Sequence, residues 1–160
     1  MPISSVGNRR RGITLMELMV VLAIIALIVG ITYPSTIAGL ENIRLAAGAR
    51  SVAAFVNAAA NRADRRQQAI ELTVQIKENV ITMRSADGAL AKRLDLPQGV
   101  RLRAVWPALP EPSGEPRRFL LQPGGVPPRI GIELANAHGK RRIVRLDPVT
   151  GVTEIENPES

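Results

Sequence analysis

The chain has 160 residues, a formal net charge of +7 and no cysteine, so one modest domain with one further segment is the natural count. The absence of cysteine excludes a disulfide framework, and a single histidine leaves a zinc site or a Ser–His site without enough groups. Three of the positive charges are Arg9, Arg10 and Arg11, and removing them would leave +4. An excess of this size does not by itself indicate a nucleic-acid partner.

Directly after these arginines, residues 13–33 form an apolar run with one charge, Glu17. As a helix, this run would be about 31 Å long, close to the thickness of a bilayer core. A buried core helix would need a larger core than this chain can build, and a secretory signal peptide would not carry the carboxylate. A plain single-span anchor explains the length but gives Glu17 no role. A fourth interpretation uses every residue of the segment.

Two properties of the run bear on its use. Positive residues beside a span stay in the cytoplasm, so the arginines predict a cytoplasmic N-terminus and an external C-terminal domain. An unpaired carboxylate in hydrocarbon costs about 3 kcal/mol on insertion scales, so Glu17 is expected to have a partner. The alternative is a carboxylate that reaches back to the lipid headgroups.

Residues 9–18 read Arg-Arg-Arg-Gly-Ile-Thr-Leu-Met-Glu-Leu. The order of a basic leader, Gly12, an apolar residue, Thr-Leu-x-Glu and an apolar run resembles the N-terminus of type IV prepilins, which include type IV pilins and type II secretion pseudopilins. The resemblance implies cleavage after Gly12 by the prepilin peptidase and N-methylation of Ile13, where the family most often has Phe. It also implies that Glu17 pairs with the N-terminal amine of a neighbouring subunit during assembly.

The resemblance divides the chain into a leader (1–12), a transmembrane helix (13–34) and a periplasmic domain (35–160). Within that domain, apolar residues recur at intervals of three and four, which predicts an amphipathic helix to about Arg66. The residues of this stripe are Leu45, Ala49, Val52, Val56, Ala59 and Ala63.

Beyond the helix the period changes to two, which predicts strands. The predicted strands are 70–76, 80–84, 100–106, 119–122, 130–134, 142–146 and 152–155, with a short apolar piece at 94–96. Four prolines make 107–118 a loop. One helix followed by antiparallel strands is an α+β layout. It is similar to the pilin fold, in which the helix packs across a sheet.

Two local pieces resemble the pseudopilin H (GspH) branch, which includes the related minor pilin FimT. One is residues 49–65, helix positions that precede an alternating strand. The other combines Phe119-x-x-x-Pro-Gly-Gly with Ile132-x-Leu, and Arg142-Ile-Val with Pro148-x-Thr-Gly.

A basic cluster near the C-terminus comprises Lys140, Arg141, Arg142 and Arg145. Four positive charges in six positions suit a phosphate contact, and the FimT resemblance suggests DNA capture. Against this, no aromatic side chain is interleaved for base stacking, and several glutamates follow closely. A solvated strand face, a DNA contact and a patch for a partner protein all stay open.

These observations predict a non-enzymatic subunit without cofactor or metal, anchored in the inner membrane by a single span. The resemblance implies a minor pseudopilin of the type II secretion system, with the prepilin peptidase and other major and minor pseudopilins as partners. The alternative is a FimT-like minor type IV pilin in pilus assembly or DNA uptake, with nucleic acid as a partner. A plain anchored periplasmic binding domain is a third class.

Overall fold

The computed structural model describes residues 14–108 and 115–158, with the side chains of 32–38 left out. The chain divides into two compact units, Met1–Ile37 and Ala38–Ser160. Helix α1 (Leu15–Arg66) contributes to both units. The described strands are β1 (Ile70–Gln75), β2 (Val80–Ser85), β3 (Ala91–Asp95), β4 (Val100–Trp106), β5 (Arg117–Leu121), β6 (Ile130–Asn136), β7 (Arg141–Leu146) and β8 (Thr153–Glu156).

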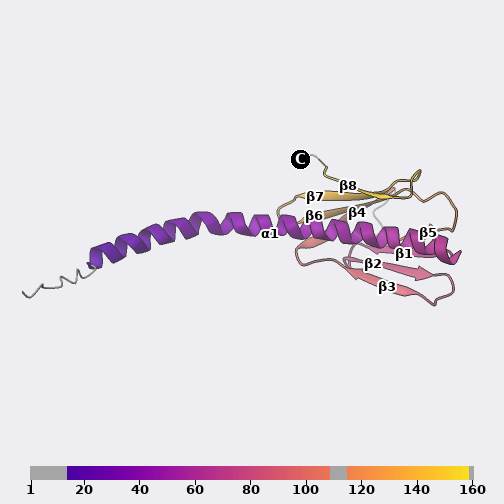
Figure 1. Cartoon of the computed structure of the whole chain (residues 1–160), viewed down its shortest axis with the longest axis horizontal. Helices are drawn as coiled ribbons and strands as arrows, with labels where there is room; N and C mark the ends of the chain where they lie inside the picture. Colours follow the sequence, from indigo (N-terminus) through magenta and orange to yellow (C-terminus); the bar gives the residue numbers. More distant parts are fainter. Residues whose placement is uncertain (1–13, 109–114, 159–160) are drawn as a thin grey trace, which may run out of the picture. The chain divides into compact units, whose positions relative to one another are not determined.

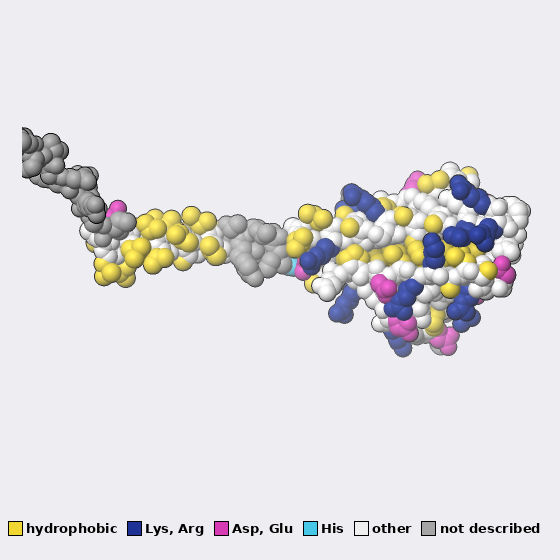
Figure 2. Space-filling view, turned by 60° about the horizontal axis from the view of Figure 1, so that its bottom comes forward, with side chains coloured by type: hydrophobic (Ala, Val, Ile, Leu, Met, Phe, Trp, Pro, Cys, Tyr) yellow, Lys and Arg dark blue, Asp and Glu magenta, His cyan; other side chains and the backbone are white. Residues whose placement is uncertain are grey.

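The described part of the first unit is the N-terminal portion of α1. Every residue from Thr14 to Ile31 is exposed, and the large apolar side chains there expose from 46% at Val21 to 77% at Leu15. Figure 2 shows hydrophobic side chains over most of the visible surface of this segment. A helix that is apolar on every side has no polar face to turn to water, so its surface is suited to an apolar environment.

The second unit contains two four-stranded sheets, ordered β3-β2-β1-β5 and β4-β6-β7-β8. Every strand pair is antiparallel. In Figure 1 the later turns of α1 run past strands of both sheets. This is the α+β architecture that the sequence predicts, with the strands divided between two sheets.

The core lies between α1 and the inner faces of the two sheets. All six residues of the predicted helical stripe are at most 2% exposed, which confirms that face of the helix. Gly48 lies on the same face, and a Cβ there would be 3.2 Å from Cγ1 of Val100. The small residues therefore let the helix approach the strands closely, while Ile70, Leu72, Ile132 and Leu134 fill the space from the sheet side.

Asn79, in the turn between β1 and β2, joins one sheet to the other. Its Nδ2 donates to the carbonyl of Val100 at 2.9 Å, and its Oδ1 accepts from the amide of Leu102 at 2.7 Å. The amide side chain thus pairs with β4 as a neighbouring strand would. Asn79 has a φ of 58°, a left-handed conformation that asparagine tolerates better than most residues.

The turn between β6 and β7 is attached to the helix by polar side chains. Oδ1 of Asn136 accepts from the amides of His138 (3.1 Å) and Lys140 (2.9 Å), and its Nδ2 donates to Oδ1 of Asn42 at 3.2 Å. The His138 ring bonds to the carboxylate of Glu41. His138, the single histidine of the chain, is exposed in this turn and contacts α1 through Glu41.

Strand β3 is the element that the sequence pattern did not reveal. It covers Ala91–Asp95, and only its last two residues fall within the apolar piece noted at 94–96. As an edge strand that is exposed along most of its length, it carries no alternation of buried and exposed side chains. Strand β5 begins at Arg117, inside the predicted loop, of which residues 109–114 lie outside the described part.

Candidate assembly site and basic surface

Helix α1 begins with a side-chain cap at Thr14. The Thr14 hydroxyl oxygen accepts from the amide of Glu17 at 3.2 Å, and the Thr14 carbonyl accepts from the amide of Leu18 at 3.2 Å. Thr14 is therefore the N-cap residue, satisfying one of the amides that the first turn leaves without a partner. Sequence reasoning gave Thr14 no role, although Thr-x-x-Glu is a recognised capping signal.

Glu17 occupies the third helical position, in the first turn of α1. There the exposed amides give the helix end a partial positive charge, which favours a carboxylate. Its side chain is exposed among exposed apolar residues. The structure thus gives Glu17 a local stabilisation at the helix end and leaves its carboxylate accessible. The predicted cleavage residues Gly12 and Ile13 lie outside the described residues, as does the predicted leader 1–12.

The predicted span, residues 13–34, is described with side chains only from Thr14 to Ile31. Among the residues that the structure describes, it contains no helix with both the length and the apolar character needed to cross a membrane.

The basic cluster is divided by the alternation of β7. Arg141 and Arg145 lie on one face of the strand, while Arg142 is half-buried on the opposite face and Lys140 is exposed in the preceding turn. Nη1 of Arg141 is 3.5 Å from Oε1 of Glu133, and Nε of Arg145 is 3.2 Å from Oε2 of Glu156. Arg141 and Arg145 therefore each have a carboxylate partner, and Lys140, Arg141 and Arg142 line one pocket of about 320 Å³ beside Asn42 and Leu45 of α1.

Glu133 is a buried carboxylate that the sequence did not single out. It is 5% exposed, and its Oε1 lies 3.5 Å from Arg141 and 3.9 Å from Nε of Arg103 without a hydrogen bond. Alternation places it on the outer face of β6, where a glutamate is normally solvated. It is buried because β6 lies between β4 and β7, whose arginines cover it from both sides. Arg103 and Arg141 therefore neutralise the buried charge of Glu133.

Next to Glu133, Gly131 supports the indole of Trp106. A Cβ at Gly131 would be 3.2 Å from Cε3 and 3.3 Å from Cβ of Trp106, so the ring lies directly on the glycine backbone. A cavity of about 420 Å³ adjoins this contact, lined mainly by apolar side chains. Only a glycine at this position lets the indole pack so closely against β6.

Asp147 organises the turn before β8. Its carboxylate accepts from the amide of Val149 at 2.7 Å and from that of Thr150 at 3.4 Å. These backbone hydrogen bonds, that of Val149 above all, hold the pKa of Asp147 below its ordinary value. Asp147 is thus a structural turn residue. Within residues 14–108 and 115–158, the structure contains no group of three or more His, Asp or Glu side chains that could hold a metal ion.

A helix packed on antiparallel strands is the fold that the resemblance to pilins implies, and two comparisons support it. Residues 7–33 match the prokaryotic N-terminal methylation motif, which implies an N-terminal membrane anchor. A search of curated proteins found no significant match to the sequence.

Among solved structures, the chain is similar to the minor pseudopilin EpsH from the type 2 secretion system of Vibrio cholerae. The TM-score is 0.56 at 12% identity, covering 73% of this chain and 99% of that one. At this identity the likeness establishes the fold. Motif and fold together confirm the predicted type IV pilin-like character, and the fold is similar to that of a minor pseudopilin.

Proposed function

We propose that the protein is a minor pseudopilin of the type II secretion system, a structural subunit without catalytic activity. The observation that carries the proposal is the N-terminal methylation motif at 7–33, with Glu17 in its register, on a chain that has the fold of a minor pseudopilin. The subunit would be made as a prepilin, cut after Gly12 by the prepilin peptidase and methylated on Ile13. It would join other pseudopilins in the fibre that drives export across the outer membrane.

The apolar surface of α1 supports a transfer from bilayer to fibre. Residues 14–31 expose apolar side chains on every side, so a bilayer and a bundle of similar helices suit this segment about equally. Packing and the pairing of Glu17 would then decide between the two environments. The arginines before the segment support an orientation with the N-terminus in the cytoplasm and the domain in the periplasm.

Glu17 would provide the specific attraction between subunits. After cleavage, the α-amine of Ile13 is the positive group nearest to the carboxylate, and Arg9, Arg10 and Arg11 leave with the leader. Because Glu17 belongs to a helix that Thr14 caps, its carboxylate is held in the first turn, where a neighbour's amine could reach it. Removing one partner of such a desolvated pair costs about 3–5 kcal/mol.

The test is the replacement of Glu17 in cells that contain the other pseudopilins. Glu17→Gln and Glu17→Ala should be inserted and cut after Gly12, which mass spectrometry would show as a chain that starts at methylated Ile13. Both variants should fail to co-purify with partner subunits and should abolish secretion. Glu154→Gln, which removes an exposed carboxylate from the domain, is the matched control and should behave as wild type.

Two outcomes would contradict the proposal. A mature chain that still begins at residue 1 would end the prepilin interpretation. Assembly of both Glu17 variants at the wild-type level would show that the charge pair is not needed, and Glu17 would then serve only the helix end.

A further inference from the structure

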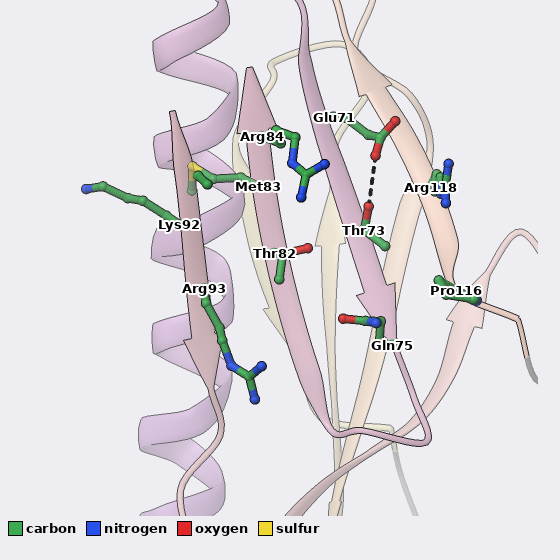
Figure 3. A pocket seen from close by; sticks show the side chains of 11 residues that line it. Glu71, Thr73, Gln75, Thr82, Met83, Arg84, Lys92, Arg93, Pro116 and Arg118 are labelled. Carbon is green, nitrogen blue, oxygen red and sulfur yellow. Dashed lines mark hydrogen bonds between the residues drawn. The ribbon is translucent and has the colours of Figure 1, made fainter. Parts of the chain in front are cut away.

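The outer face of the sheet β3-β2-β1-β5 carries a groove with a volume of about 360 Å³. Its floor consists of side chains from β1 and β2 that alternate with the buried residues of the core, and Figure 3 shows them on the side of the sheet that faces away from α1. We call this surface the arginine–threonine groove and define it by Glu71, Thr73, Thr82, Arg84, Arg93 and Arg118.

Strand register places these residues in two rows across the sheet. In the first row, Arg118 lies opposite Thr73, Thr73 opposite Thr82, and Thr82 opposite Arg93. A row over four strands covers three strand spacings, about 14 Å. Two hydroxyls thus stand between two guanidinium groups at opposite ends of the groove. In the second row, Glu71 lies opposite Arg84 on one side and Leu120 on the other.

The arginines of the groove are mostly free to bind. Arg84, Arg93 and Arg118 are exposed, and Arg93 is paired with Asp95 at 2.8 Å. Within the described part of the chain, the guanidinium groups of Arg84 and Arg118 have no hydrogen bond and no ion pair. Thr82 is half-buried and likewise has no hydrogen bond there. Planar guanidinium groups bind carboxylates with two hydrogen bonds, so the groove is suited to an anionic ligand.

Glu71, the acidic residue in the floor of the groove, helps to distinguish a peptide ligand from a nucleic-acid ligand. Glu71 is half-buried and accepts from the Thr73 hydroxyl at 3.2 Å, which leaves its carboxylate able to accept further donors. A phosphodiester backbone offers no donors and would be repelled by this charge. Among the described residues that line the groove, none is aromatic and able to stack on a base. A peptide offers backbone amides for Glu71 and the threonines, and acidic side chains for the arginines.

We propose that the arginine–threonine groove binds an extended acidic segment of a partner protein. About 14 Å corresponds to four extended residues, so acidic side chains four positions apart could reach Arg118 and Arg93 together. The exposed Leu120 beside Glu71 adds an apolar contact at the edge. The proposal rests on the proposed function, in which the partners of the domain are proteins of the fibre or its cargo.

The experiment measures fluorescence anisotropy of a labelled eight-residue peptide of alternating Glu and Ser with the full chain in neutral detergent micelles. The same peptide with Gln in place of Glu, and a short DNA duplex, serve as comparison ligands. We expect the Glu peptide to bind, and the Gln peptide and the DNA duplex not to bind. The double variant Arg84→Gln with Arg118→Gln removes two of the three guanidinium groups of the groove, and should weaken binding of the Glu peptide about tenfold.

The matched control is the double variant Arg50→Gln with Arg65→Gln, which removes the same charge from exposed positions on α1. It should change the affinity for the Glu peptide by less than twofold. Equal losses in the two double variants would reduce the effect to net charge and overturn the proposal, as would absence of binding. Duplex binding that depends on Arg84 and Arg118 would overturn it in favour of a phosphate surface.

The binding measurement tests only the groove proposal, and the Glu17 experiment tests only the proposed function. Peptide binding needs neither cleavage after Gly12 nor assembly. A negative result would remove the groove proposal and leave the proposed function intact. Conversely, Glu17 variants that assemble normally would contradict the proposed pairing without changing the expected affinity for the peptide.

Discussion

Asn79 offers a direct test of how the two sheets are held together. In Asn79→Ala, the hydrogen bonds to Val100 and Leu102 are lost, at about 1 kcal/mol each. Alanine must also adopt the φ of 58°, and it lacks the polar side chain with which asparagine offsets part of the cost of about 1–2 kcal/mol in that region. The free energy of unfolding should therefore fall by about 3 kcal/mol.

The assay is urea unfolding of the full chain in mild detergent, followed by the fluorescence of Trp106, the single tryptophan. With a slope of about 1.5 kcal/mol per molar urea, the midpoint should fall by about 2 M. Asn79→Asp keeps the acceptor for Leu102 but puts a carboxylate oxygen against the Val100 carbonyl in place of the donor, so it should restore little of the stability lost in Asn79→Ala. Asn61→Ala, at an exposed helix position, is the control and should stay within about 0.5 kcal/mol of wild type.

Two results would refute this reasoning. A loss below about 1 kcal/mol in Asn79→Ala would show that water replaces the side-chain bonds at no net cost. Wild-type stability in the Asp variant would mean that the hydrogen bond donated to Val100 contributes nothing.

Two further predictions concern the second sheet. Gly131→Ala should displace the Trp106 ring, shift its emission and lower the free energy of unfolding by about 1–3 kcal/mol, because the new Cβ would lie 3.2 Å from the indole. Gly39→Ala, where a Cβ meets nothing within 4 Å, should not do so. The pKa of Asp147 is lower in the folded state than its ordinary value of 3.8. Its contribution to the free energy of unfolding is therefore fully present above pH 3.8 and is lost as the pH falls through the folded-state pKa. Urea midpoints between about pH 5 and 2.5 should thus fall more steeply for wild type than for Asp147→Asn, and parallel curves would refute that assignment.

Local periodicity explains how much of the fold could be predicted from the sequence. The stripe from Leu45 to Ala63 and most strands follow from spacings of three to four and of two, because one face of each element is buried. Strand β3 has no buried face, so no pattern marks it. The division into two sheets depends on which distant strands pair, and that choice is made by tertiary packing.

The candidate sites show the same limits. The sequence carried the signal for the Thr14 cap, because Thr and Glu three positions apart precede an apolar run. The basic residues at 140–145 are close together in sequence, but strand alternation places Arg141 and Arg142 on opposite faces of β7. The burial of Glu133 could not be anticipated, because it results from arginines on two other strands. The groove is formed by alternate residues of four strands, and it can be recognised only when the register of these strands is known.

The attachment of the β6–β7 turn to α1 has a mechanical consequence. Among the side chains of α1 that the structure describes, Leu45 is the first that is buried in the core. Glu41 and Asn42, which hold the turn through His138 and Asn136, precede it by one turn. Tension along α1 from its N-terminal end would load these polar bonds before any apolar contact of the core. These hydrogen bonds act over a short distance, so they would break after a small extension and re-form when the load is released. The domain could then absorb a brief pull at one turn of helix without exposing its interior.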